Sequence, residues 1–229
     1  MRSVTWVALA AGISLASSPA LAATNLITNG SFETGDFTGW TYSGVTPSGA
    51  PAVIIPYNSN AGYPGGAYGE PIPPDNSASP SPDPVGDNAA YFVADGATES
   101  LSQTVHLLPG LYTIGFSVYV PLNGFNNAGN ATFTGTIAGV NLANFTVDTS
   151  TPQVWVHYAG VANILTEGDY LSSFTFASAQ GAAGDFVVDR AYIVAGNAIP
   201  EPSAWALMIL GFGGVGGALR ARRSLLAAA

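Results

Sequence analysis

The 229-residue sequence contains no cysteine. Neither disulfides nor thiolate chemistry can therefore contribute, and stability has to come from packing or from a metal held by other ligands. Histidine is almost as scarce, because His106 and His157 are the only two and they show no metal-ligand spacing. Ordinary hydrogen-bonded histidines are the expected interpretation of both.

Basic residues are also few, and lysine is absent. Region 23–199 holds 13 of the 14 acidic residues but only one of the five arginines, Arg190, so its net charge is about −12. Such a surface repels phosphate backbones, which argues against nucleic acid as a partner. It remains compatible with divalent cations, neutral glycans or plain solubility. We expect the lone Arg190 to pair with one of the acids.

No segment of region 23–199 has a helical stripe of apolar residues. Residues 111–120 instead alternate, with Tyr112, Ile114, Phe116, Val118 and Val120 on one face, which predicts a half-buried strand. Similar runs, separated by Gly, Pro, Asn and Asp, occupy 89–94, 100–107, 131–137, 144–147, 153–161, 170–177 and 186–194. The sequence therefore predicts a single all-β domain over 23–199, an antiparallel β-sandwich or jelly roll.

Residues 56–84 interrupt this pattern with eight of the 16 prolines. Proline cannot donate to a strand ladder, so an irregular excursion is predicted, with a loosely packed or disordered segment favoured over a functional loop. Tyr57, Tyr63 and Tyr68 lie within it and are candidates for stacking on sugar rings. Trp155, on a predicted strand, is either a core residue or a further sugar platform, with the core favoured.

The N-terminus has the features of a secretory signal peptide. Arg2 precedes an apolar run over 4–15, and Ala20 and Ala22 supply the small residues that signal peptidase requires. We expect residues 1–22 to be removed after Ala22. The sequence therefore predicts an exported protein.

The C-terminus combines a polar motif, an apolar stretch and a basic end. Pro200, Glu201 and Pro202 precede Trp205 within the apolar residues 204–219, and Arg220, Arg222 and Arg223 follow, before a short tail over 224–229. Sixteen residues make a helix of about 24 Å, which can span a membrane that thins slightly, with the arginines on the cytoplasmic side.

This C-terminal arrangement resembles the PEP-CTERM sorting signal of Gram-negative bacteria, in its PEPxxWA form. The resemblance implies recognition by an exosortase, which would cut near the Pro-Glu-Pro. It thus implies a precursor anchored in the inner membrane, followed by a cell-surface or extracellular protein.

Region 23–199 also resembles a family. Asn29-Gly30-Ser31-Phe32-Glu33 with Gly39-Trp40, the run 101–105 and the closing strand 186–190 resemble carbohydrate-binding modules with a galactose-binding-like jelly roll. The resemblance implies one structural calcium ion, held by Glu33 and Asp189, because the first and last strands meet in that fold. Arg190 stands where the family usually has a second acid.

Together these features predict an exported, non-catalytic module that binds glycan or associates with exopolysaccharide in a biofilm matrix. Two alternatives stay open: a structural or adhesion protein of the matrix without a sugar site, and a small secreted glycoside hydrolase. The hydrolase is disfavoured because no flanking motif singles out a pair of carboxylates.

Overall fold

The computed structural model describes residues 23–127, 131–179 and 184–196. The predicted signal peptide, with Ala20 and Ala22, lies outside these ranges, as do the sorting residues Pro200, Glu201, Pro202, Trp205, Arg220, Arg222 and Arg223. Within the described ranges no helix is both long and apolar enough to cross a membrane. The spanning helix expected at about 204–219 is therefore still a prediction.

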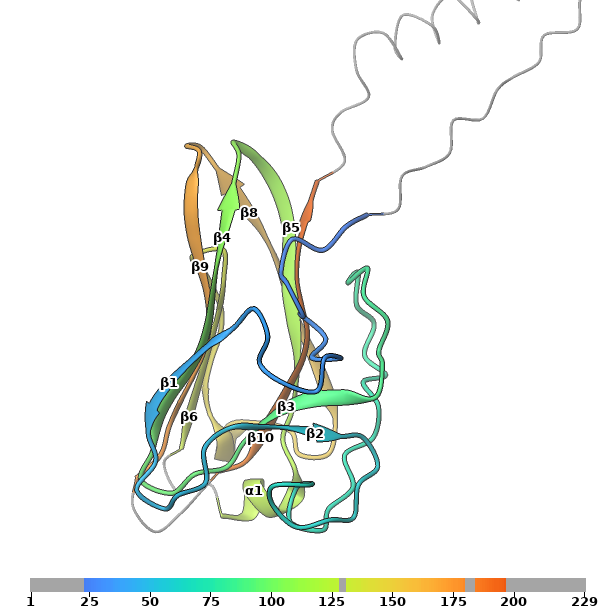
Figure 1. The fold of residues 1–229 in the computed structure, drawn as a ribbon, viewed down its shortest axis with the longest axis vertical. Helices are drawn as coiled ribbons and strands as arrows, with labels where there is room; N and C mark the ends of the chain where they lie inside the picture. Colours follow the sequence, from blue (N-terminus) through green and yellow to red (C-terminus); the bar gives the residue numbers. More distant parts are fainter. Residues whose placement is uncertain (1–22, 128–130, 180–183, 197–229) are drawn as a thin grey trace, which may run out of the picture.

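In these described ranges ten strands form two five-stranded antiparallel sheets that face each other (Figure 1). Sheet A has the order β1(Thr41–Val45), β4(Thr98–Leu107), β9(Gly168–Ala177), β6(Thr132–Ile137) and β7(Val140–Thr146). Sheet B has the order β2(Val53–Pro56), β3(Asn88–Phe92), β10(Phe186–Ala195), β5(Gly110–Tyr119) and β8(Trp155–Ile164). The predicted antiparallel sandwich is confirmed.

Each strand expected from alternation is present, within a few residues of its expected ends. The strands β1 and β2 were not expected, because each is short and carries a glycine or a proline that weakens a strand signal. The two short helical turns, α1(Leu122–Asn126) and η1(Val147–Thr149), were not expected either.

The main core lies between the sheets and is rich in phenylalanine. Phe133 packs edge to face on Phe186 with ring centroids 4.5 Å apart, and Phe116 packs in the same way on Phe174 at 5.0 Å. Gly135 lies against Phe116, where a Cβ atom would come within 2.1 Å of the ring. Glycine at this position therefore lets the two sheets approach closely.

The two ends of the described chain meet beside β10. The amide of Leu26 donates to the carbonyl of Ile193 at 2.8 Å, and the amide of Ala191 donates to Gly30 at 2.8 Å. A Cβ atom on Gly30 would lie 2.0 Å from the carbonyl oxygen of Ala191. The glycine of the Asn29–Glu33 motif is therefore required by close packing of the first segment on the last strand.

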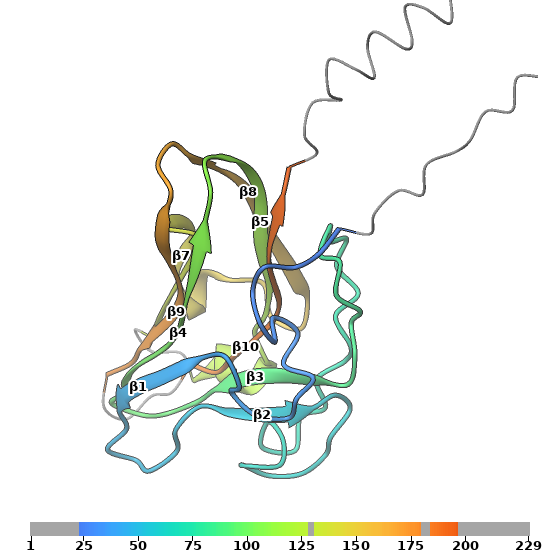
Figure 2. The same cartoon turned by 45° about the horizontal axis from the view of Figure 1, so that its top comes forward.

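Residues 56–84, which we call the proline-rich segment, cover the outer face of sheet B (Figures 1 and 2). Ala67 and Ile72 of the segment are each 1% exposed and belong to a second apolar cluster with strand residues such as Tyr91 and Val187. The expectation of a loosely packed segment was wrong, because the outer face of sheet B supplies apolar side chains for it to cover.

The proline-rich segment also changes the environment of β5. The strand was predicted to be half-buried, yet every residue from Ile114 to Tyr119 is buried, since one face meets sheet A and the other meets the proline-rich segment.

Candidate functional site

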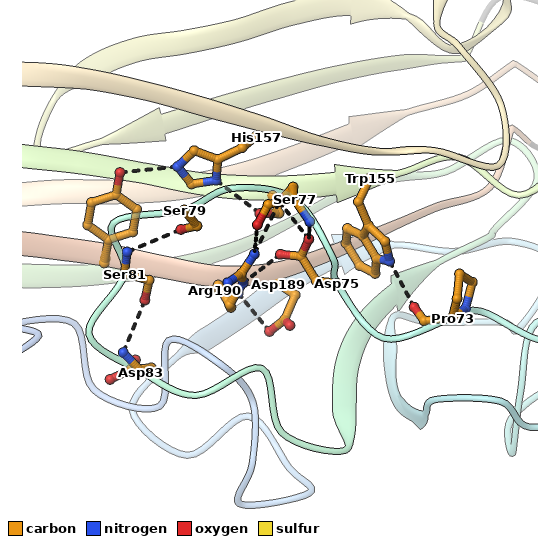
Figure 3. A network of polar contacts seen from close by, with 12 residues as sticks. Pro73, Asp75, Ser77, Ser79, Ser81, Asp83, Trp155, His157, Asp189 and Arg190 are labelled. Atoms are coloured by element: carbon orange, nitrogen blue, oxygen red, sulfur yellow. Dashed lines mark hydrogen bonds and ion pairs between the residues drawn. The ribbon is translucent and has the colours of Figure 1, made fainter.

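One buried ion pair fastens the proline-rich segment to sheet B (Figure 3). The Nε atom of Arg190 in β10 donates to Oδ2 of Asp75 at 2.6 Å, and its Nη2 atom donates to the carbonyl of Ser77 at 2.7 Å. The side chains of Arg190 and Asp75 are 8% and 0% exposed. The expectation that Arg190 pairs with an acid is confirmed, and we call this contact the clasp.

A bulge in β10 directs Arg190 toward the segment. The register with β5 shifts between Asp189 and Tyr192, and Arg190 takes a left-handed φ of 47°. Burial alone would raise the pKa of Asp75, but the hydrogen bonds from Arg190 and Ser77 outweigh it and hold the pKa below its usual value. Asp75 is therefore ionised at neutral pH.

A chain of hydrogen bonds extends from the clasp across the sheet. Oγ of Ser77 contacts Oγ of Ser117 at 3.1 Å, Ser117 contacts Nδ1 of His157 at 3.0 Å, and Nε2 of His157 contacts the Tyr192 hydroxyl at 3.2 Å. Burial and the charge of Arg190 lower the pKa of His157, so its imidazole is neutral. Ser117 is fully buried, and the second ring nitrogen of His157 contacts Tyr192 rather than a carboxylate, so this serine–histidine contact lacks the third, orienting group of a nucleophilic pair.

Trp155 lies in the second apolar cluster, beneath the proline-rich segment. It is 5% exposed, and its indole nitrogen donates to the carbonyl of Pro73 at 2.8 Å. Tyr57 packs edge to face on it at 6.0 Å, while the Tyr57 hydroxyl donates to the buried Asp189 at 2.5 Å. Of the two interpretations of Trp155, the structure supports the core residue, and Tyr57 points inward with it.

Tyr63 and Tyr68 form a stacked pair at the tip of the proline-rich segment. Their ring centroids are 6.1 Å apart at an interplanar angle of 17°, and the Tyr63 hydroxyl donates to Pro51 at 2.8 Å. Tyr68 is 52% exposed and has a left-handed φ of 49°. A bulky residue with positive φ is uncommon and strained. The structure therefore presents one aromatic ring to solvent with a second ring behind it.

Glu70 holds this tip against the sandwich. Its carboxylate accepts the backbone amides of Leu122 and Asn123 at 2.8 and 3.0 Å and the side-chain amide of Gln153 at 3.1 Å. The tip is thus fixed at one end by Glu70 and further along by the clasp. Neither Glu70 nor Asp75 could have been selected from the sequence, because region 23–199 offers 13 acids and no motif marks them.

The expected calcium ligands have separate surroundings. Glu33 accepts the amides of Asp87 and Asn88 at 2.8–3.0 Å and lines an open pocket of about 560 Å³ together with Asp83. Asp189 is fully buried and accepts from Tyr57 and from the Arg190 amide. Among the described residues, no three acidic or histidine side chains converge as a metal site. A calcium ion held by Glu33 and Asp189 stays a prediction from the sequence resemblance.

A further buried carboxyl group, Asp185, makes stability depend on pH. Tyr91 donates a hydrogen bond to it, and burial raises its pKa to about 7. Between about pH 4 and pH 7 the folded state keeps a proton that the unfolded state loses, so stability falls as pH rises through this window.

We therefore expect Asp185→Asn to stabilise the protein by up to about 4 kcal/mol at pH 8 and to leave it unchanged at pH 4. Urea denaturation at both pH values measures this. The raised pKa of the buried Glu99 acts in the same direction, so the slope with pH is reduced rather than abolished. An equal effect at both pH values would contradict the assignment.

The sequence comparisons give one match. Residues 198–223 match the PEP-CTERM protein-sorting motif, which indicates export as a membrane-anchored precursor that an exosortase sorts to the cell surface. No curated protein matches the chain.

Solved structures similar to this chain include carbohydrate-binding modules. TmCBM61, solved in complex with β-1,4-galactotriose, is 22% identical over 76% of this chain and 99% of its own, with a TM-score of 0.47. The family 16 carbohydrate-binding module-2 is 17% identical over 74% and 99%, with a TM-score of 0.42. The K1 cleaved adhesin domain of Lys-gingipain from Porphyromonas gingivalis is 14% identical over 73% and 96%, also at 0.42. These likenesses are distant, and the strand order above defines the fold.

Proposed function

We propose that this protein is an exosortase-sorted protein of the cell surface or extracellular matrix whose sandwich is a non-catalytic glycan-binding module. The observation that supports it best is the exposed ring of Tyr68, stacked on Tyr63 and held in a strained backbone conformation. Strain of this kind persists where the surrounding structure enforces it, and it concentrates at ligand-binding positions.

The tip has the properties that sugar stacking needs. A sugar ring presents a face of C–H groups that packs on an aromatic face, while its hydroxyls need polar partners nearby. No hydrogen bond of the Tyr68 hydroxyl is present in the described structure, which leaves that group available to a ligand. Because Glu70 and the clasp already fix the tip, little conformational freedom is lost on binding.

The acidic charge of region 23–199 favours an uncharged glycan over a polyanion. The two alternatives, a matrix protein without a sugar site and a small glycoside hydrolase, predict different outcomes. The first predicts no glycan retention, and the second predicts release of reducing sugar.

We expect Tyr68→Ala to weaken binding to an uncharged oligosaccharide at least tenfold, about 1.4 kcal/mol, because the exposed ring is removed. Glycan-array screening selects the oligosaccharide, and calorimetry on wild-type and variant protein measures the change. Tyr68→Phe keeps the ring and retains most of the affinity. Leu165→Ala, at a position 79% exposed and outside the segment, is the matched control. Equal affinity of wild type and Tyr68→Ala would remove Tyr68 from the site.

The proposal includes one structural calcium ion with Glu33 and Asp189 as ligands. Its support is the resemblance of the sequence to carbohydrate-binding modules. Glu33 in its open pocket has room for an ion, whereas Asp189 would have to give up its contacts with Tyr57 and the Arg190 amide.

A further inference from the structure

The outer face of sheet A carries a regular array of small uncharged polar side chains, eight hydroxyls and two amides. In one row across the five strands, directly paired residues are Ser43, Ser100, Thr175, Thr134 and Asn144. The next row is Thr41, Ser102, Ser173, Thr136 and Asn141. We call these two rows the hydroxyl face.

The hydroxyl face is open to solvent in the described structure. None of its residues is buried, in contrast to the residues between them on the same strands, which point into the core. The hydroxyls of Ser100, Thr134, Thr136 and Thr175 make no hydrogen bond within the described chain, whereas that of Ser102 reaches the Thr41 carbonyl at 3.4 Å. Most of the array is therefore free to bind a ligand.

The face has no charge, although region 23–199 carries 13 acids. The charged residues on the same side, His106, Glu167 and Asp169, lie at one end of β4 and β9 and bond to one another there. The solvated face of an antiparallel sheet is polar, and on this face the two rows of polar residues are all uncharged. An uncharged ligand suits a neutral face on an acidic protein, since a polyanion would be repelled by the remainder.

The spacing of the array favours a ligand that is itself periodic. Neighbouring strands lie about 4.8 Å apart, and residues on one face of a strand repeat every 6.8 Å or so. Each hydroxyl can donate or accept, so it can match either polarity of a sugar hydroxyl. Serine and threonine also lose little side-chain freedom on binding.

The position of the chain ends leaves this face accessible. Both ends of the described chain leave beside β10 and β5 in sheet B, on the side of the proline-rich segment and away from sheet A (Figures 1 and 2). Residue 196, the last described residue, therefore lies on the opposite side of the sandwich from the hydroxyl face.

We propose that the hydroxyl face binds the flat surface of an uncharged, packed polysaccharide through many weak hydrogen bonds made together. This extends the proposed glycan-binding function and rests on it, but it uses a different surface from Tyr68. Because each contact is weak, a polymer surface binds and a free monosaccharide does not compete.

The test is retention of the full-length protein, in mild detergent, on microcrystalline cellulose, insoluble mannan and chitin, with alginate gel as the charged control. We expect retention on at least one uncharged polymer, insensitive to excess monosaccharide. Ser100→Lys with Thr136→Lys places two long cations on the face and lowers retention about tenfold. Asn163→Lys with Leu165→Lys adds the same charge at exposed positions in and after β8, and leaves retention unchanged.

A milder variant separates loss of hydroxyls from loss of fold. Thr134→Val with Thr175→Val keeps the shape of two facing side chains and their strand preference, and lowers retention several-fold. Retention on none of the uncharged polymers overturns the proposal. Retention that persists in both face variants and disappears in Tyr68→Ala also overturns it. That result would leave the proposed glycan-binding function standing, with Tyr68 as its site. An assay of ice recrystallisation tests a different ligand. If the protein inhibits recrystallisation, the face variants abolish this inhibition and no polymer is retained, the hydroxyl face binds ice instead of polysaccharide.

Discussion

Replacing Arg190 by methionine is expected to lower the free energy of unfolding by about 3–5 kcal/mol, because it leaves the carboxylate of Asp75 buried without its partner. The Asp75 side chain is fully buried, and the donors that remain to it are uncharged: the amide and hydroxyl of Ser77 and the hydroxyl of Ser117. Methionine has a similar length and the same backbone preference, so the left-handed φ at this position adds no new strain. Urea denaturation followed by tryptophan fluorescence measures the change.

The double variant Arg190→Met with Asp75→Asn is the control for this prediction. Removing the charge of Asp75 recovers a large part of the loss, because the buried group left behind is neutral. Limited proteolysis gives an independent measure, since residues 56–84 lose their fastening and become the first site of cleavage. A loss below about 1 kcal/mol for the single variant would show that the clasp does not hold the segment.

Replacing Trp155 by alanine is expected to cost about 3–5 kcal/mol of stability. The indole is 5% exposed, packs on Tyr57 and Tyr119, and donates to Pro73, so alanine leaves a cavity and an unpaired carbonyl beneath the proline-rich segment. Chemical denaturation again provides the measurement.

The matched control for Trp155 is Tyr68→Ala, at the exposed tip of the same segment. It is expected to change stability by less than about 0.5 kcal/mol while weakening glycan binding. The two variants therefore distinguish an aromatic side chain of the core from an exposed ring that stacks on a sugar. A Trp155→Ala protein with wild-type stability and no glycan binding would reverse the two assignments.

The sandwich could be predicted from the sequence because a strand with one buried face alternates. Residues 100–107 and 170–177, for example, alternate between buried and more exposed positions, and Leu101, Val105, Phe174 and Phe176 face the core. Alternation fails for β1 and β2, which are short, and it misleads for β5, whose second face is buried by residues far away in the sequence.

The clasp could not be predicted, because it joins residues that are 115 positions apart. The sequence indicated that Arg190 needs an acidic partner, but choosing Asp75 among 13 acids requires the path of the proline-rich segment over sheet B. Prolines in that segment were taken to oppose order. In the structure they suit an extended chain that packs by its side chains and needs no ladder hydrogen bonds.

The sequence named Tyr57, Tyr63, Tyr68 and Trp155 alike as candidates for sugar stacking. It offered no way to tell the exposed Tyr68 from Tyr57 and Trp155, which face inward. Burial separates the four, and burial depends on the long-range packing that fixes the segment. The hydroxyl face was missed because each strand shows only an ordinary polar alternation. The array becomes visible when the strand register aligns its rows.

Together the two proposed surfaces lie on opposite sides of the sandwich, Tyr68 on the proline-rich segment over sheet B and the hydroxyl face on sheet A. A module of this form would bind two polysaccharide chains at once, which suits a protein that residues 198–223 direct to the cell surface.

The most direct measurement is the binding of purified protein to an array of uncharged and charged glycans, with wild type and Tyr68→Ala compared side by side. If the sandwich binds glycan through Tyr68, uncharged glycans give signals that fall at least tenfold in the variant, and no reducing sugar is released. An array without any signal from the folded wild-type protein would contradict glycan binding and favour a matrix protein that associates by other means.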